Sequence, residues 1–136
     1  MGKVLKAVIE FADNNYSAYL VDVDGIIGIG GTLEDVKRSL LESIKYTVDE
    51  AVEDGLEIPE PLKGEYEVKF TFDLPTFLQL YDKVVSKSGL ERITGINQKQ
   101  LWHYANGLRR PKTSTVKRVS DSIHRFAEDL LSVEFA

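Results

Sequence analysis

The feature that most constrains the fold of this 136-residue chain is one apolar stripe between residues 33 and 51. Apolar side chains recur there at spacings of three and four residues, which is the period of one face of an α-helix. Thr32 stands before the stripe as an N-cap with Asp35 three residues on, and Gly55 is placed to end the helix. A helix with a single apolar face must pack that face on another element, so the sequence predicts a sheet beneath it. The stripe consists of Leu33, Val36, Leu40, Ile44, Val48 and Ala51.

Strand-like segments flank this helix on both sides. Residues 4–11 and 16–23 are apolar runs joined by a polar Asp-Asn-Asn turn, which predicts a hairpin, and residues 26–29 form a short third strand. After a proline-containing connector, residues 65–72 alternate between polar and apolar side chains, which predicts a strand with one wet face and favours antiparallel pairing. The order β-β-β-α-β over residues 1–73 therefore predicts a small antiparallel sheet with one packed helix.

The remaining residues, 74–136, carry helical periodicity and are predicted to form a separate all-α domain, so the chain as a whole is α+β. A first helix begins near Pro75, and the Ser-Gly pair at residues 88 and 89 separates it from a short helix over Leu90–Thr94. Gly95 ends that helix, and Asn97 caps the next one, with Gln100 placed to complete a capping box. A last helix from about residue 115 has a predicted inner face of Val116, Val119, Ile123, Phe126 and Leu130.

The formal net charge of −5 hides two halves of opposite sign. Residues 1–82 carry 7 basic and 17 acidic side chains, a net charge of −10. Residues 83–136 carry 10 basic and 5 acidic side chains, a net charge of +5. This asymmetry suggests a different partner for each half, with nucleic acid the natural partner of the basic one. Charge alone leaves a solvated basic face equally open.

Within the basic half, a short helix, a glycine turn and a capped helix have the layout of a helix-turn-helix. Apolar side chains are expected to hold the two helices together, which leaves polar side chains near the N-terminus of the second helix facing outward, where base edges are reached in the major groove. The cations that follow suit phosphate oxygens, whereas Trp102 is expected to be a partly buried packing residue. The predicted DNA-binding residues are Asn97, Gln98, Lys99, Gln100, His103, Asn106, Arg109, Arg110 and Lys112.

This region resembles the DNA-binding domains of the Cro/lambda-repressor-like class. The similarity lies in the turn glycine Gly95, the apolar Ile96 after it, the core Leu101 and the closing pair Asn106-Gly107. Where that class usually has a small residue in the first helix of the motif, this chain has a glutamate, residue 91. One such motif reads few base pairs, so we expect a homodimer or a higher even oligomer.

The chain as a whole is similar to the HicB antitoxin family. The motifs that carry the similarity are Asp24-Gly25, the run from Gly31 to Val36 that opens the long helix, and Ile58-Pro59-Glu60-Pro61. The resemblance implies a first domain with a partial RNase H-like fold that binds and blocks a HicA-like, mRNA-cleaving toxin, and a second domain that represses the operon encoding both proteins. An acidic domain suits a basic, RNA-cleaving partner. The residues we expect to contact the toxin are Tyr16, Tyr19, Asp22 and Asp24.

Composition narrows the chemistry further. The absence of cysteine excludes disulfides, thiol nucleophiles and cysteine-based zinc sites, and two histidines do not favour a multi-histidine metal centre. We expect no catalytic residue, metal or cofactor, and a reduced, cytoplasmic protein with neither a membrane segment nor an export signal. Two alternatives stay open: a ligand-sensing repressor without a toxin partner, and a metal-dependent nuclease of the RNase H kind. The carboxylates of such a nuclease would be Asp13, Asp22, Asp24 and Glu34.

Overall fold

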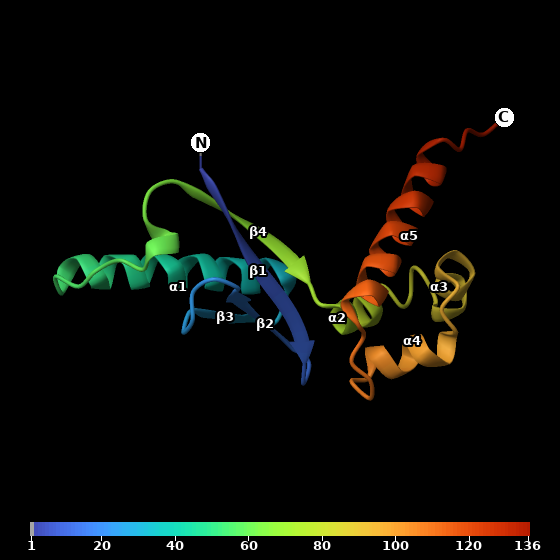
Figure 1. Ribbon diagram of the computed structural model, residues 1–136, viewed down its shortest axis with the longest axis horizontal. Coiled ribbons are helices and arrows are strands. Elements are labelled where there is room, and N and C mark those ends of the chain that lie inside the picture. The colour runs from blue at the N-terminus through green and yellow to red at the C-terminus, as the bar shows by residue number, and fades with distance from the viewer. Residues whose placement is uncertain (1) are drawn as a thin grey trace. The chain divides into compact units, whose positions relative to one another are not determined.

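The computed structural model describes residues 2–136, which form two compact units (Figure 1). Unit 1 ends at Asp73 and unit 2 begins at Leu74, where the sequence changes from strand to helix periodicity. Each unit has its own cluster of buried apolar side chains, so each can be described by itself. Within residues 2–136, no helix combines the length and the hydropathy that crossing a membrane requires.

Unit 1 is a four-stranded sheet with a long helix, in the strand order β3-β2-β1-β4. β1 pairs antiparallel with β2, and β2 with β3, but β4 runs parallel to β1. The sheet is therefore mixed, and the predicted antiparallel pairing is wrong for β4. Alternation of polar and apolar side chains reports one buried face but carries no strand direction, and the return through the helix brings β4 in parallel to β1. The elements are β1 (Lys3–Ala12), β2 (Asn15–Leu20), β3 (Ile27–Gly30), α1 (Leu33–Glu53), the 3-10 helix η1 (Glu60–Leu62) and β4 (Tyr66–Phe72).

Helix α1 forms where the apolar stripe predicts it. The Thr32 hydroxyl accepts a hydrogen bond from the Asp35 N–H at 3.1 Å, and the stripe is buried against the sheet through Val36, Leu40 and Ile44. The helix lies directly on β3, because a Cβ built at Gly28 would be 2.5 Å from the backbone nitrogen of Leu40. Glycine is thus required in β3 by the close approach of the helix backbone.

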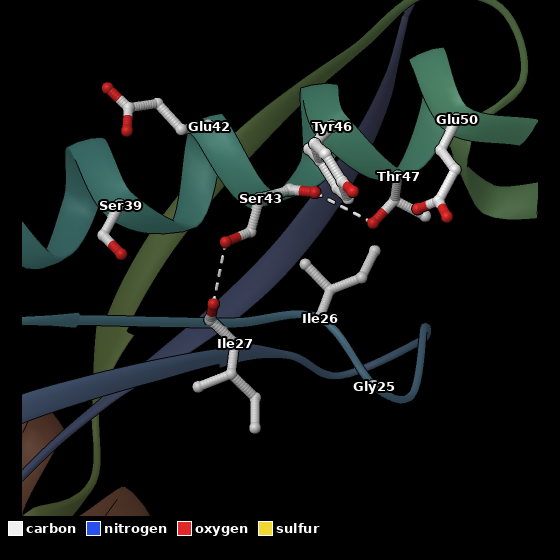
Figure 2. Close-up of a pocket in the computed structure, with 9 residues that line it drawn as sticks. All are labelled: Gly25, Ile26, Ile27, Ser39, Glu42, Ser43, Tyr46, Thr47 and Glu50. Carbon is white, nitrogen blue, oxygen red and sulfur yellow. Dashed lines mark hydrogen bonds between the residues drawn. The ribbon is translucent and has the colours of Figure 1, made fainter. Parts of the chain in front are cut away.

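The outer edge of β3 is covered by the same helix. The Ser39 hydroxyl accepts a hydrogen bond from the Ile29 N–H at 3.0 Å, and the Ser43 hydroxyl donates one to the Ile27 carbonyl at 2.9 Å. Figure 2 shows the second of these contacts between α1 and the strand. Two polar groups of this edge strand are therefore bonded within the domain, which reduces its capacity to pair with another strand.

Unit 2 contains four helices around a small core formed by Leu78, Leu90, Leu101 and Val119. The helix predicted over Leu90–Thr94 starts earlier than expected. Ser86 caps it, so Ser88 and Gly89 lie inside the helix. The Ser-Gly pair does not interrupt it because the Ser86 hydroxyl, which accepts from the Gly89 N–H at 3.0 Å, opens the helix before that pair. The helices are α2 (Leu74–Leu80), α3 (Lys87–Thr94), α4 (Gln98–Ala105) and α5 (Thr113–Leu131).

The last helix, α5, is longer than the core that it covers. Its first half is buried at Val119, with Ile123 half-buried against the same cluster. Val116, Phe126 and Leu130 are exposed, so the prediction of an inner face is wrong for these three residues. The other helices of the unit are too short to reach Phe126 and Leu130, since α3 and α4 have eight residues each and α5 has 19. Val116 lies in the first turn of α5, before the helix meets the core at Val119.

Candidate functional site

The turn between α3 and α4 has the geometry that the sequence predicts. Gly95 adopts a φ of 76°, in the left-handed region, and its N–H donates to the Glu91 carbonyl at 2.8 Å. The Thr94 hydroxyl donates to the Leu90 carbonyl at 2.7 Å and accepts from the Ile96 N–H at 3.1 Å. These local bonds fix how the chain leaves α3 and enters α4.

The N-terminus of α4 is held by two side-chain acceptors. The Asn97 side chain accepts from the Lys99 N–H at 2.7 Å, which confirms Asn97 as the N-cap. The Glu91 carboxylate, reaching across from α3, accepts from the Gln98 N–H at 2.8 Å. The glutamate that departs from the Cro/lambda-repressor-like pattern thus points outward and stabilises the start of the second helix.

One side of α4 packs against the core of unit 2. Leu101, Tyr104 and Ala105 are buried, and the Gln79 side chain donates to the Ala105 carbonyl at 2.7 Å. Gln100 is half-buried and donates through Nε2 to the Tyr104 hydroxyl at 2.9 Å. The predicted capping box is not formed, because the Asn97 side chain accepts from the Lys99 N–H and not from the Gln100 N–H, and the Gln100 amide bonds to Tyr104 one turn later.

The opposite side of α4 is open to solvent. Gln98 and Lys99 are exposed, as predicted, and Trp102 beside them is 49% exposed. His103 is half-buried and makes an edge contact with the Trp102 ring, at 5.7 Å between ring centroids. Asn106 is exposed, but its amide donates to the Trp102 carbonyl at 2.9 Å and closes the helix. Trp102 was missed as a surface residue, although it lies four residues after Gln98 and so on the same helix face.

Exposed cations lie on α3, on α5 and in the segment that follows α4. Arg109, Arg110 and Lys112 are exposed in the segment that joins α4 to α5. Arg92 on α3 and Arg118 on α5 are also exposed, and a Cβ built at Gly95 would lie 2.7 Å from Nη2 of Arg118. Within residues 2–136, none of these five forms a salt bridge. Their charge is therefore available to an anionic partner.

Two further cations of unit 2 form salt bridges within the unit. The Lys87 ammonium lies 2.7 Å from the Asp82 carboxylate, and the Lys117 ammonium lies 2.7 Å from the Asp121 carboxylate. The hydrogen bond from Lys117 lowers the pKa of Asp121 below its usual value. These lysines balance nearby acids, so the positive character of unit 2 comes mainly from the arginines, Lys99 and Lys112.

In unit 1, the structure does not bring the four predicted toxin-contacting residues to one surface. Tyr16 points toward the core beneath α1, with its ring centroid 4.7 Å from that of Phe11. Tyr19 points to the opposite face of the sheet, since three residues in a strand reverse the direction of the side chain. Asp22 and Asp24 are exposed in the turn that leads from β2 to β3.

Tyr19 belongs to an apolar surface that sequence reasoning missed. We call it the open sheet face: it is the side of the sheet opposite α1. In the sheet, Val8 lies opposite Tyr19, and Tyr19 lies opposite Ile27, so the three side chains form one row across three strands. Ile27 and Ile29 are 59% and 62% exposed, which is large for isoleucines in strands. The apolar residues of the open sheet face are Val4, Val8, Tyr19, Val21, Ile27 and Ile29, and the charged residues Lys6, Glu67 and Lys69 lie on the same face.

A shallow pocket lies between α1 and the start of β3 (Figure 2). Its wall is polar and negative: Glu42 and Glu50 come from α1, and hydroxyl groups come from the serine, threonine and tyrosine side chains between them. Ile26 and Ile27 form the opposite wall. Such a pocket favours a cationic side chain over an anionic ligand.

The carboxylates considered for a nuclease are not gathered into a metal site. Among residues 2–136, no three histidine, cysteine, aspartate or glutamate side chains are close enough together to hold a metal ion. No protein-family model, curated protein or solved structure matches the chain.

Proposed function

We propose that this chain is an antitoxin of two domains, in which unit 2 represses its own operon by binding operator DNA and unit 1 binds and neutralises a HicA-like, mRNA-cleaving toxin. The observation that carries the proposal is the exposed N-terminal half of α4. It is positioned by the Gly95 turn and by the Asn97 and Glu91 contacts, and is flanked by cations without salt bridges in the described chain. This is the arrangement by which a recognition helix enters the major groove.

In this proposal the residues of unit 2 divide their tasks. Gln98 and Lys99 read base edges, and Trp102 lies over the sugar-phosphate wall of the groove. Arg109, Arg110 and Lys112 bind phosphate oxygens and set the position of the helix on the duplex. His103 and Gln100 are partly buried, so they support the face more than they read bases.

The protein-binding half of the proposal is supported by unit 1. The open sheet face exposes a cluster of apolar side chains, which on a folded domain marks an interaction surface. Unit 1 (residues 1–73) carries 7 basic and 16 acidic side chains, a net charge of −9, and charge complementarity would steer a basic partner to it. Tyr19 on that face, and Asp22 and Asp24 beside the same strand, remain our proposed toxin contacts.

Unit 2 would bind the operator as a homodimer through the second half of α5. We call Ile123, Phe126 and Leu130 the α5 ridge: they are spaced by three and four residues, and their exposure grows toward the helix end. Such spacing suits the packing of two helices along a shared seam. A dimer doubles the number of base contacts by placing two recognition helices on two half-sites.

Removing single cations tests the DNA face. Lys99→Ala and Arg110→Ala are each expected to weaken binding to the chain's own upstream DNA about tenfold, and to reduce the slope of log affinity against log salt by about one. Fluorescence anisotropy with that duplex and a scrambled duplex, at several salt concentrations, measures both quantities. Lys45→Ala, which changes an exposed lysine of α1, is the control. Unchanged affinity and slope in both variants would place the DNA elsewhere.

Removing the negative charge at the start of α4 is expected to change DNA affinity in the opposite direction, toward tighter binding. Glu91→Gln is expected to raise DNA affinity about twofold to fivefold, because a carboxylate beside the recognition helix repels phosphate. The same change is expected to lower the free energy of unfolding by about 1 kcal/mol, since the bond to the Gln98 N–H loses its charge. Anisotropy and urea unfolding followed by Trp102 fluorescence measure the two effects. Glu128→Gln on α5 serves as the control, and weaker DNA binding by Glu91→Gln would contradict the assignment.

A separate experiment distinguishes the antitoxin from a ligand-sensing repressor. The chain is co-expressed with the product of the adjacent reading frame, and the purified complex is assayed for cleavage of mRNA. An antitoxin gives a stoichiometric complex in which cleavage is suppressed until the chain is removed. A repressor that senses a metabolite gives no such complex, and its operator affinity changes with a small molecule instead.

A further inference from the structure

The two edges of the sheet in unit 1 differ in how their backbone groups are bonded. At the β3 edge, Ser39 and Ser43 of α1 bond to the backbone of the strand. At the other edge, β4 has β1 as its only neighbour in the sheet order, and no other strand within residues 2–136 pairs with it. The sheet therefore has one covered edge and one open edge.

Hydrogen bonds at both ends of β4 show which of its backbone groups face outward. The Lys3 N–H donates to the Glu65 carbonyl at 3.1 Å, and the Asp73 N–H donates to the Ile9 carbonyl at 3.4 Å. Residues 65 and 73 thus direct their backbone groups to β1, and along a parallel ladder every second residue does so. Tyr66, Val68 and Phe70 consequently direct their N–H and carbonyl groups away from the sheet.

The side chains along this edge alternate in a way that suits a partner strand. Tyr66, Val68 and Phe70 are half-buried on the helix side, because α1 lies mainly over β3 and β2 and leaves the border of the core open. The Lys37 ammonium lies over the Phe70 ring, 5.5 Å from its centroid. On the other face, Glu67 and Lys69 are exposed and carry opposite charges two residues apart.

We propose that β4 pairs antiparallel with β4 of a second copy of this chain, with Val68 opposite Val68 across a two-fold axis. In this register Tyr66 lies opposite Phe70 of the second copy, and Glu67 lies opposite Lys69. The two-fold axis repeats each pair, so the interface contains two opposite-charge pairs on one face and a row of apolar contacts on the other. The outward backbone groups meet each other, and the two sheets join into one of eight strands.

The charges along β4 favour this register, and they favour a second copy of the chain as the partner strand. Centring the pairing on Tyr66 places Glu65 opposite Glu67, and centring it on Phe70 places Glu67 opposite Asp73. Like charges directly opposite each other are unfavourable in a sheet. A lysine on an open edge ordinarily discourages pairing, but here the glutamate two residues before it makes the strand complementary to itself. A second copy therefore fits this edge better than a strand of unrelated charge.

Charge exchange tests the pairing with the full-length chain. Light scattering coupled to gel filtration gives the mass of the wild type and of Glu67→Lys, Lys69→Glu and the double variant. Each single change opposes like charges twice and is expected to halve the mass, whereas the double change restores opposite charges and the wild-type mass. Glu65→Lys is the matched control, because it changes the same charge on the same chain segment but lies opposite Thr71.

A cysteine gives an independent test of the register, since the chain has none of its own. Val68→Cys places the new side chain opposite its own copy, at a Cα separation of about 5.5 Å, which a disulfide can bridge. Under mild oxidation it is expected to form a covalent dimer at dilute protein, whereas Phe70→Cys, opposite Tyr66, is not. Circular dichroism confirms that each variant is folded before it is compared.

These outcomes are separate from those of the proposed function. Operator binding by unit 2 tests the DNA face and the α5 ridge, whichever way the β4 experiments turn out. A wild type that runs as a monomer, single variants that keep the wild-type mass, or equal crosslinking of the two cysteine variants would each overturn the β4 pairing. Loss of the toxin complex in Glu67→Lys with unchanged mass of the free chain would assign this edge to the toxin instead.

Discussion

Replacing Gly28 with alanine is expected to destabilise unit 1 strongly and to leave the stability of unit 2 unchanged. The new Cβ would lie 2.5 Å from the backbone nitrogen of Leu40 and 2.7 Å from its Cα, and neither atom belongs to a flexible side chain. Helix α1 must therefore move away from β3, which loosens the burial of Val36, Leu40 and Ile44. Overpacking costs about 1–3 kcal/mol where side chains can adjust, and we expect at least about 3 kcal/mol here because backbone must shift.

Such a loss is a large part of the about 5–15 kcal/mol that keeps a domain folded. Urea unfolding followed by far-UV circular dichroism reports both units, whereas Trp102 fluorescence reports unit 2 alone. In Gly28→Ala the circular dichroism transition is expected to move to lower urea and the fluorescence transition to stay in place. Gly31→Ala is the matched control, since a Cβ there has no neighbour within 4 Å. Equal midpoints for the two variants would mean that α1 does not press on β3 as described.

Periodicity predicted most elements of this fold but not the direction of one strand. The stripe that starts at Leu33 and the alternation that ends at Phe72 each report a local pattern of burial, and the structure has a helix and a strand there. Strand direction depends on how the chain returns from α1, which no local pattern records. The requirement for glycine at position 28 is likewise tertiary, because it arises from Leu40, twelve residues away.

In the candidate site, too, local features were predicted from the sequence and tertiary contacts were not. The cap at Asn97 and the turn at Gly95 are local, so the exposed positions of Gln98 and Lys99 followed from them. Gln100 differs because its partner is the Tyr104 hydroxyl, a choice that the capping pattern does not reveal. The opposite directions of Tyr16 and Tyr19 were available from their odd spacing in a strand.

For α5, the sequence identified an apolar face but not what would cover it. Val119 meets the core of unit 2, whereas Leu130, on the same face, is 55% exposed beyond the end of that core. A periodic apolar stripe predicts that some element packs on the helix, and in unit 2 the other helices reach only its first half. The uncovered half is what the proposed dimer buries, so its removal has a defined consequence for DNA binding.

Leu130→Glu is expected to abolish this dimer and to weaken binding to a two-half-site operator at least about 100-fold, because linking two binding modules ordinarily gains about 10²–10⁴ in affinity. Affinity for a single half-site should stay the same, since Leu130 lies far along α5 from the segment that carries Arg109 and Arg110. Anisotropy with full-site and half-site duplexes measures both. The measurement is repeated in the Glu67→Lys background, so that pairing through β4 cannot hold two copies together.

The neighbouring residue supplies the control for this prediction. Leu131→Glu changes an 86% exposed leucine one position off the α5 ridge, so it adds the same charge at the same end of the helix without entering the proposed seam. It is expected to keep the full-site affinity within about twofold, the size of a screened surface-charge effect. If Leu130→Glu and Leu131→Glu bind the full site equally, the two recognition helices are joined by something other than α5. If both lose affinity for the half-site as well, the added charge acts on the DNA face directly and the ridge has no separate role.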